Sequence, residues 1–446
     1  MPELTLNDER VEVEWHAAVE RELETTRART HAWIATLTNE QLCAEPPAPM
    51  GPLVWDLAHL ANYEERWCVR ALGGAPIAPE LDDLYDAFET PRPQRVARPL
   101  LDRAQALDYM ARVRAATLAV LRDGPPAGQL AHQGFVFRMI AQHECQHQET
   151  LLQGLQLGGE PCEALRSAHA RETEAQQRAG IEAKQRVRVP AGPFVVGTSD
   201  RSCAWDNERG AHRHELPAFE IDRYPVTNGR WLRFLGDGGY ARSEFWSAEG
   251  WAWRERESIA APLGWRPRVG GGWCVERLGH EVALALDEPV QHVSCHEAEA
   301  FARWAGGRLP SEAEWEKAAA WDPARPEGRP YPWGVERPDE ERANVGAQRL
   351  GPAPIGSYPA GASHCGAEQM LGDVYEWTSS SFQAYPGFQA FPYREYSQVF
   401  FGRRYRVLRG SSWAAGAPLA RTTYRNWDLP ERRQLFCGLR LAWDAA

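Results

Sequence analysis

The chain has 446 residues, which is too long for one ordinary domain and long enough for two or three. Lysine and arginine number 50 against 61 aspartates and glutamates, so the net charge is −11, which argues against a nucleic-acid binder. The opening residues, MPELTLNDERVEVEW, lack the order of a signal peptide, and no apolar run is long enough to span a bilayer. We expect a soluble, cytoplasmic protein that binds neither nucleic acid nor membrane.

The periodicity of apolar residues up to about Leu165 predicts four helices. Their expected ranges are about Asp8 to Ala35, Val54 to Ala71, Asp102 to Arg122 and Phe135 to Leu157. Four helices of this length predict an up-and-down bundle, in which metal ligands come from facing helices. The loop at residues 73–99 is too long to be a mere connection and is expected to line a site.

A polar and charged segment separates the two halves of the chain. Residues 166–186 are expected to form an exposed linker, which gives a helical domain at 1–165 and a second domain at 187–446. The nine cysteines are an odd number and contain no CxxC pair, so reduced thiols are favoured over disulfides or a cysteine-rich zinc module.

The second half has short β-type runs, such as RVRVPAGPFVVGT, that alternate with Gly, Pro and Asn turns. Only two helices are clear there. They follow Ser294 and Ser311, and each serine has a glutamate three residues later, the spacing of a capping box. The rest is irregular β-structure with long loops, so an α+β fold is expected for this domain.

The segment HECQH, from His143 to His147, lies within the fourth predicted helix. Four residues is just over one helical turn, so both imidazoles project from one face and can hold one metal ion. The pattern HExxH alone suggests a zinc hydrolase with Glu144 as general base. Two histidines on such a helix can also be merely interfacial, and Cys145 beside them is expected to pack rather than bind metal. A third ligand would decide between these interpretations.

His59 is the candidate third ligand, on the second predicted helix in GPLVWDLAHLANYEERW. Trp55 and Tyr63 flank it one turn away on either side, so this face can point into the bundle. A lone histidine there is ordinarily a core residue, but an antiparallel bundle can bring it opposite His143 and His147. Three neutral imidazoles would leave positions open for substrate and oxygen, as non-heme iron sites do. The spacing does not decide between iron and zinc.

Longer motifs make the second half recognisable. It contains PAGPFVVGT, YPVTNGRWLRF, PVQHVSCHEAEAFARWAGGRLPSEAEWEKAA, GDVYEWTSS, VLRGSSW and FCGLRLAW. These motifs resemble the formylglycine-generating-enzyme (sulfatase-modifying factor) domain, which has a C-type-lectin-like core. The first half resembles the DinB-like helical bundle. In this order, and with the three histidines, essentially the whole chain resembles the ergothioneine-biosynthetic sulfoxide synthases (EgtB).

This resemblance implies iron(II) held by His59, His143 and His147. It also implies oxygen-dependent joining of a thiol sulfur to the imidazole ring of trimethylhistidine (hercynine), with oxidation of the sulfur to a sulfoxide. The thiol would be γ-glutamylcysteine, although relatives take cysteine or a selenosugar. Glu144 then has no hydrolytic role, and Gln146 matches a residue that contacts hercynine.

Two segments of the second half carry further implied site residues. Tyr393 and Tyr396 resemble the active-site tyrosine pair of the family, one of which supplies a proton, a task that suits a phenol. Asn426, Trp427 and Asp428 resemble its substrate-binding stretch, in which the aspartate meets the amino group of the thiol substrate. Without the resemblance, the tyrosines would be packing aromatics and Asp428 a turn residue.

Arg92 and Arg95, in PRPQR, resemble the arginine pair that binds the carboxylates of γ-glutamylcysteine. Guanidinium groups pair bidentately with carboxylates, so two arginines suit a dicarboxylate thiol. The alternatives are a solvated basic cluster, or a register shifted by three that would substitute Arg98 for one of the pair.

One departure from the formylglycine-generating enzymes is informative. The run LARTTYRNWD lacks the copper-binding cysteines that perform their chemistry, so the fold is expected without that activity, and Cys437 is expected to be buried packing. A structural calcium ion in the second domain is a further implication of the resemblance. The oligomeric state is not readable from the sequence.

Overall fold

The computed structural model describes residues 6–159 and 185–445, which divide into two compact units. The first unit contains the described residues up to 159 together with Asp200–Cys203, and the second contains the remaining described residues from 185 onward. Residues 166–184 of the predicted linker lie outside the described residues, so the exact domain bounds stay predictions. None of the described helices is both long and apolar enough to cross a membrane.

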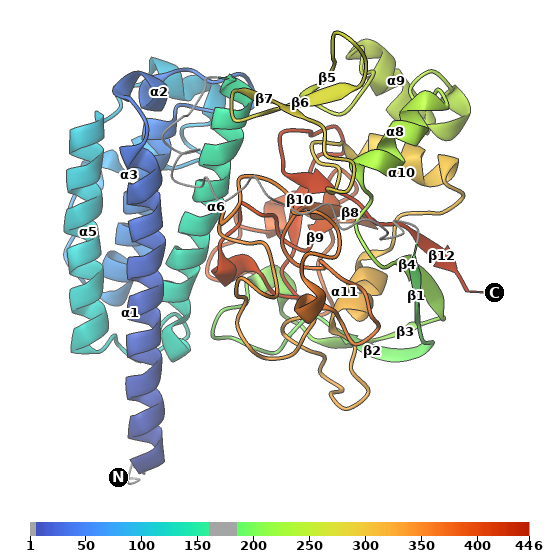
Figure 1. Ribbon diagram of the computed structural model, residues 1–446. Helices are drawn as coiled ribbons and strands as arrows, with labels where there is room; N and C mark the ends of the chain where they lie inside the picture. Colours follow the sequence, from blue (N-terminus) through green and yellow to red (C-terminus); the bar gives the residue numbers. More distant parts are fainter. Residues whose placement is uncertain (1–5, 160–184, 446) are drawn as a thin grey trace. The chain divides into compact units, whose positions relative to one another are not determined.

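Four long helices form the first unit, as predicted (Figure 1). They are α1 (Leu6–Ala35), α3 (Leu53–Glu64), α5 (Arg103–Asp123) and α6 (Phe135–Gly158). Helix α3 packs on α5 and α6, and α1 packs on the same two helices. Every residue of α3 is buried, so the polar side chains on this helix must find partners inside the bundle.

The second predicted helix does not run unbroken to Ala71. Helix α3 ends at Glu64, and the chain continues as a π turn, η1 (Glu65–Val69), and a 3-10 turn, η2 (Arg70–Leu72). A hydrophobic period cannot distinguish these helix types, which differ by one hydrogen-bond step.

The loop that follows α3 is built from short helical turns. They are η3 (Pro79–Leu81), α4 (Asp82–Tyr85) and η4 (Arg92–Ala97). Two further short elements complete the first unit, α2 (Asn39–Cys43) before α3 and η5 (His132–Gly134) before α6.

Twelve short strands in four sheets, counted over residues 185–445, make the second unit α+β, as predicted (Figure 1). One sheet has the order β1-β4-β12 (Arg186–Val189, Phe219–Asp222, Ala442–Asp444), and another has the order β10-β9-β8-β11 (Asn426–Asp428, Arg406–Arg409, Tyr375–Ser381, Cys437–Gly438). The others are the pair β2-β3 (Gly192–Val196, His212–Leu216) and the sheet β5-β6-β7 (Trp265–Pro267, Trp273–Arg277, His280–Ala283). Phe219 and Ile221 of β4 pack with Trp315 in a buried core.

Two of the four helices that the structure describes in this unit match the capping-box predictions. They are α10 (Cys295–Trp304) and α11 (Glu312–Ala320), and both capping boxes are formed. The prediction of only two helices was wrong, because α8 (Asn228–Gly236) and α9 (Ala248–Arg256) also form. Each is short and contains glycine, which lowers the intrinsic preference for a helix.

Candidate metal centre

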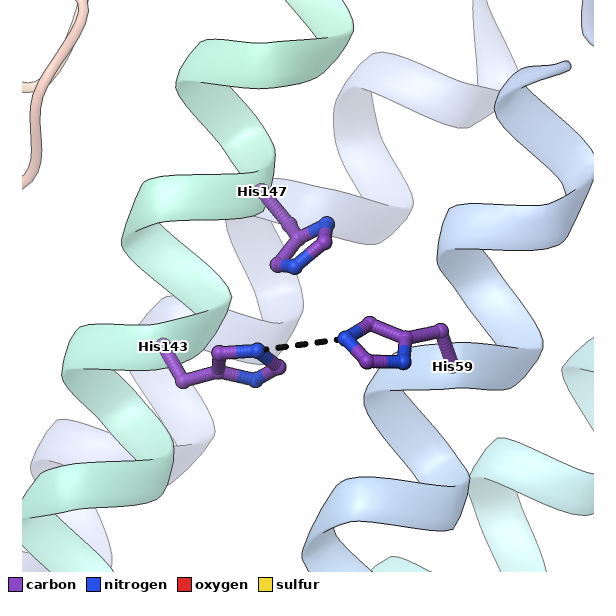
Figure 2. A group of neighbouring side chains, drawn as sticks. All are labelled: His59, His143 and His147. Carbon is purple, nitrogen blue, oxygen red and sulfur yellow. Dashed lines mark hydrogen bonds between the residues drawn. The ribbon is translucent and has the colours of Figure 1, made fainter. Parts of the chain in front are cut away.

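Three histidine side chains converge in the first unit (Figure 2). His143 and His147 project from one face of α6, and His59 projects toward them from α3. One ring nitrogen from each lies within 4.8 Å of the others. The described ranges contain no second such cluster of His, Cys, Asp or Glu side chains. Calcium is often bound through backbone carbonyls, so the structural calcium ion stays a prediction.

The Nδ1 atoms of two of these histidines donate hydrogen bonds to oxygen atoms of the protein. His59 Nδ1 lies 2.6 Å from the carbonyl oxygen of Tyr85, and His147 Nδ1 lies 3.0 Å from Oδ1 of Asp56. A carbonyl oxygen can only accept, and an ionised carboxylate can only accept, so both Nδ1 atoms carry the hydrogen. The Nε2 lone pairs of these two imidazoles are then available to a metal, which is the usual arrangement of ligating histidines.

Burial keeps His59 and His143 neutral. Burial, with a smaller contribution from His147, lowers the pKa of His59 to about 3, and the same causes hold the pKa of His143 well below its usual range. Burial by itself would raise the pKa of Asp56, but the hydrogen bond with His147, together with the charges of Arg95 and Arg92, outweighs it and lowers that pKa. The centre therefore combines two imidazoles that burial holds neutral with one ionised carboxylate behind His147.

The spacing of the nitrogens suits a metal ion. His59 Nε2 and His143 Nε2 lie 3.3 Å apart. Two nitrogens at about 2.1 Å from one ion are separated by roughly 3.0–3.4 Å for octahedral to tetrahedral angles. Aromatic stacking fixes both rings, because His59 stacks on Trp55 at 4.5 Å and His143 stacks on Tyr63 at 3.9 Å between centroids. The residues present therefore fit a metal held by three imidazoles.

Glu144 does not serve this centre. Its carboxylate is fully buried and receives Arg27 Nε at 2.8 Å, Arg114 Nη2 at 3.1 Å and the Thr30 hydroxyl at 2.6 Å. Glu64 binds the same two arginines, so the four charges form one network in the bundle core. Although burial would raise the pKa of Glu144, the two arginines lower it to about 2. A carboxylate held in this way is a structural anion, and the hydrolase interpretation of HExxH loses its general base.

The cysteine within the motif is packing, as predicted. Cys145 is fully buried, receives a hydrogen bond from Arg29 Nη2 at 3.3 Å, and has its pKa raised to about 11 by burial. Gln146 lies one position before His147 on α6 and is partly buried, so it is close in sequence to a ligand but does not belong to the cluster of three.

The predicted arginine pair lies beside the histidine cluster in the first unit. Arg95 is buried, and its guanidinium carbon lies 3.3 Å from the centroid of the Trp55 ring, the same ring that stacks on His59. Arg92 is partly buried, and a Cβ atom at Gly51 would lie 3.2 Å from Arg95 Cδ and 3.9 Å from Arg92 Cγ. Arg98 is exposed. Burial lowers the pKa of Arg95 to about 10, so it stays charged at neutral pH.

The site residues predicted in the second half also lie together, within the second unit. Tyr393 and Tyr396 are partly buried and meet edge to face at 6.3 Å between centroids. Tyr396 meets Trp427 of β10 edge to face at 5.7 Å. Asn426 and Asp428 flank Trp427 on this strand, and both are partly buried. The structure thus brings the two predicted segments into one aromatic cluster.

Two residues of the centre were not found by sequence reasoning. Asp56 lies three positions before His59, so the fragment DLAH could have suggested that a carboxylate lies on the same helical face as the histidine. Tyr85 contributes through its backbone carbonyl, which no residue pattern reveals. Cys437 is buried packing, as expected, and its thiol donates to the carbonyl of Val293 at 3.1 Å.

Comparison with known proteins identifies both halves. A model of the sulfatase-modifying factor enzyme 1-like domain matches residues 170–445, and one of the DinB superfamily matches residues 22–151. The hercynine oxygenase of Mycobacterium tuberculosis is 50% identical over 426 residues, which cover 94% of this chain and 96% of that protein. The hercynine oxygenase of Mycolicibacterium thermoresistibile is 48% identical over 446 residues, covering 97% and 96%.

The second half alone has more distant relatives. The formylglycine-generating enzyme of Bos taurus is 32% identical over 217 residues, which cover 43% of this chain and 57% of that protein. Its match is confined to part of the chain, whereas the two matches above span both halves. The resemblance inferred from the motifs is confirmed: the chain belongs to the hercynine oxygenase family and is an oxygenase with a DinB-type helical domain and a sulfatase-modifying-factor-type domain.

Proposed function

We propose that the protein is an iron(II)- and oxygen-dependent sulfoxide synthase of ergothioneine biosynthesis. It joins the thiol of γ-glutamylcysteine to C2 of the imidazole ring of hercynine and releases γ-glutamyl-hercynylcysteine S-oxide. The observation that carries the proposal is the convergence of three imidazoles, two of them buried and held neutral, in a chain of the hercynine oxygenase family. One imidazole is oriented by a carboxylate and one by a carbonyl.

The atoms and electrons of this reaction balance without a further reductant. The S–H bond of the thiol and the C2–H bond of the imidazole break, and a C–S bond forms. One oxygen atom goes to sulfur, and the other leaves as water with the two hydrogens. The substrates therefore supply all four electrons that dioxygen takes up. Iron would supply redox chemistry and would also act as a Lewis acid that lowers the pKa of the thiol. Zinc could only lower that pKa.

The residues of this chain would bind substrates and move a proton. Arg92 and Arg95 offer paired guanidinium donors to the carboxylates of the thiol substrate. Asp428 is the proposed acceptor for its amino group, with Asn426 and Trp427 beside it, and Gln146 the proposed contact to hercynine. One of Tyr393 and Tyr396 would donate its phenolic proton as oxygen is reduced.

The preference for γ-glutamylcysteine over cysteine rests on the arginines. Arg92 and Arg95 lie close enough to the centre that both lower the pKa of Asp56, while Arg98 is exposed. A thiol with two carboxylates can pair with both guanidinium groups. Cysteine has only one carboxylate, so it cannot pair with both. This supports the register Arg92 with Arg95 over Arg95 with Arg98.

A metal-exchange assay tests the proposal against two alternatives: a hydrolase, and a ligand-binding protein in which the three histidines are merely structural. The purified chain, stripped of metal and reconstituted anaerobically with iron(II) or zinc, is given hercynine and either γ-glutamylcysteine or cysteine. We expect a sulfoxide only with iron and oxygen, and faster turnover with γ-glutamylcysteine. Full activity with zinc and no oxygen would contradict the proposal, and so would a protein that binds no stoichiometric metal.

A further inference from the structure

The segment that carries both proposed active-site tyrosines is held by one buried carboxylate of the second unit. Asp206 is 1% exposed. Its Oδ1 accepts a hydrogen bond from the hydroxyl of Ser397, and its Oδ2 accepts one from the backbone N–H of Phe391 at 3.2 Å. Phe391 and Ser397 bracket Tyr393 and Tyr396, so the two oxygens of one side chain fix both ends of the tyrosine segment, residues 391–397.

The residue before Asp206 holds one tyrosine ring directly. Trp205 is 1% exposed and stacks on Tyr396 with centroids 3.7 Å apart and an interplanar angle of 13°. Tyr396 in turn meets Trp427 and Tyr393 edge to face. The orientation of the Tyr396 phenol therefore depends on where the turn η7 (Asp206–Glu208) places Trp205.

The turn η7 is itself tied to the strand that carries the proposed substrate-binding residues. The Asn207 side chain donates to Ser397 Oγ at 3.0 Å, and the Asn207 carbonyl accepts from Arg425 Nη1 at 2.7 Å. Arg425 directly precedes Asn426 of β10 and pairs bidentately with Glu312 of α11 at 2.6 and 3.0 Å. Because α11 belongs to the core, the turn η7 is anchored through Arg425 to the core of the second unit.

We propose that Asp206 is a positioning residue for catalysis: it fixes the tyrosine segment 391–397 so that a phenol meets the reacting oxygen, and it acts through Tyr393 or Tyr396 rather than on substrate. The proposal rests on the proposed function, because it assumes that a tyrosine supplies the proton. Its basis is the pair of hydrogen bonds at the two ends of one segment, together with the Trp205 stack.

The chemistry of the contacts predicts different effects for two substitutions. In Asp206→Asn, the amide oxygen can still accept from Phe391 N–H, and the amide nitrogen can donate to Ser397 Oγ, because a hydroxyl also accepts. Asp206→Ala removes both acceptors and releases both ends of the segment. We expect kcat to fall about 10- to 100-fold in the alanine variant, since a displacement of about 1 Å costs this much, with KM little changed and the asparagine variant close to wild type.

A double-mutant cycle separates positioning from a merely structural effect. Tyr393→Phe and Tyr396→Phe identify the tyrosine whose loss lowers kcat, and Asp206→Ala is then added to that variant. We expect no further loss of kcat, because Asp206 has nothing left to position. Multiplicative losses would overturn the proposal, and so would unchanged kcat in both phenylalanine variants. If Asp206→Ala does not fold, Ser397→Ala, which removes one of the two contacts, takes its place in the cycle.

Hydrogen exchange of residues 391–397 provides a readout that does not depend on activity. We expect faster exchange of this segment in Asp206→Ala than in the matched control Asp373→Ala, whose carboxylate is equally buried and accepts from Ala353 N at 2.7 Å and Asn344 Nδ2 at 2.8 Å. Equal exchange in both variants would overturn the proposal. A wild-type protein that makes no sulfoxide would instead contradict the proposed function. If the wild-type protein makes the sulfoxide but the losses of kcat in the double-mutant cycle are multiplicative, only the positioning role of Asp206 is contradicted.

Discussion

Asp56 Oδ1 lies 3.0 Å from Nδ1 of His147, so helix α3 orients a candidate metal ligand that α6 provides. Asp56 and His59 are three residues apart, on one face of α3. The same helix therefore contributes one candidate ligand, His59, and the carboxylate that orients another, His147. Tyr85, from the segment that follows α3, aims His59 in the same way through its carbonyl. The centre is built from facing helices and one loop, and its geometry depends on their packing.

Asp56→Asn should weaken iron binding without unfolding the bundle. The amide that replaces the carboxylate no longer stabilises an electron-rich imidazole, and loss of such a partner typically costs about 10- to 100-fold in metal affinity. Competition with a chromophoric chelator measures this affinity. Asp108→Asn is the matched control, because Asp108 is exposed on α5 and pairs only with Arg112 among the described residues. Equal affinity in the two variants would show that Asp56 does not support the metal.

Glu144→Gln should lower stability and spare catalysis. Removing this charge leaves Arg27 and Arg114 sharing only Glu64, and breaking a buried pair typically costs about 3–5 kcal/mol in the free energy of unfolding. Activity per bound iron should stay close to wild type. Glu64→Gln, in the same network but away from the histidine motif, should behave alike. A folded Glu144→Gln protein that binds iron and has lost all activity would restore the general-base interpretation.

Arg95→Lys should raise KM for γ-glutamylcysteine about 10- to 100-fold and leave KM for hercynine nearly unchanged. Lysine cannot form the planar, bidentate contact to a carboxylate, and hydrogen bonds to charged groups contribute about 1.5–3 kcal/mol. Steady-state kinetics with both thiols measure the effect, with Arg98→Lys as control. A larger effect at Arg98 than at Arg95 would mean that the register of the pair is shifted by three.

Asp206 should give the folding stability a pH dependence opposite to that of most carboxylates. Burial, against the hydrogen bond of Ser397, raises its pKa from 3.8 to about 6. Between these values the folded protein keeps a proton that the unfolded chain releases, so the contribution of Asp206 to stability is largest below pH 3.8 and declines as the pH rises to about 6. The loss amounts to about 3 kcal/mol at most.

Denaturant unfolding of wild type and Asp206→Asn at several pH values isolates this effect, because the amide does not titrate. The stability of wild type relative to the variant should fall from about pH 4 to about pH 6 and stay level above it. A relative stability that rises over this range would mean that Asp206 is paired more strongly as an anion than its surroundings indicate.

The bundle and the histidine pair were predictable because both follow from helical periodicity. Apolar spacing gave α1, α5 and α6 nearly to their ends, and the spacing of His143 and His147 placed both on one face. The place of His59 opposite them is confirmed by the geometry. Its helix face made it the candidate third ligand, and the resemblance strengthened that interpretation.

The supporting contacts were not predictable because their partners are distant in sequence. Glu144 meets Arg27 117 residues away, and Asp206 meets Ser397 191 residues away. Such pairings depend on tertiary packing, which leaves no periodic trace in one sequence. The same limitation explains why Glu144 first suggested a hydrolase: its motif is local, whereas its ion pairs are not.

The most direct test of the central claim is the fate of labelled oxygen in a single reaction. The iron(II) protein is mixed with hercynine and γ-glutamylcysteine under ¹⁸O₂, and the product is analysed by mass spectrometry. The proposed reaction predicts a sulfoxide that carries one ¹⁸O atom, with consumption of one dioxygen per product. Product formed without oxygen, or a sulfoxide whose oxygen comes from water, would contradict it.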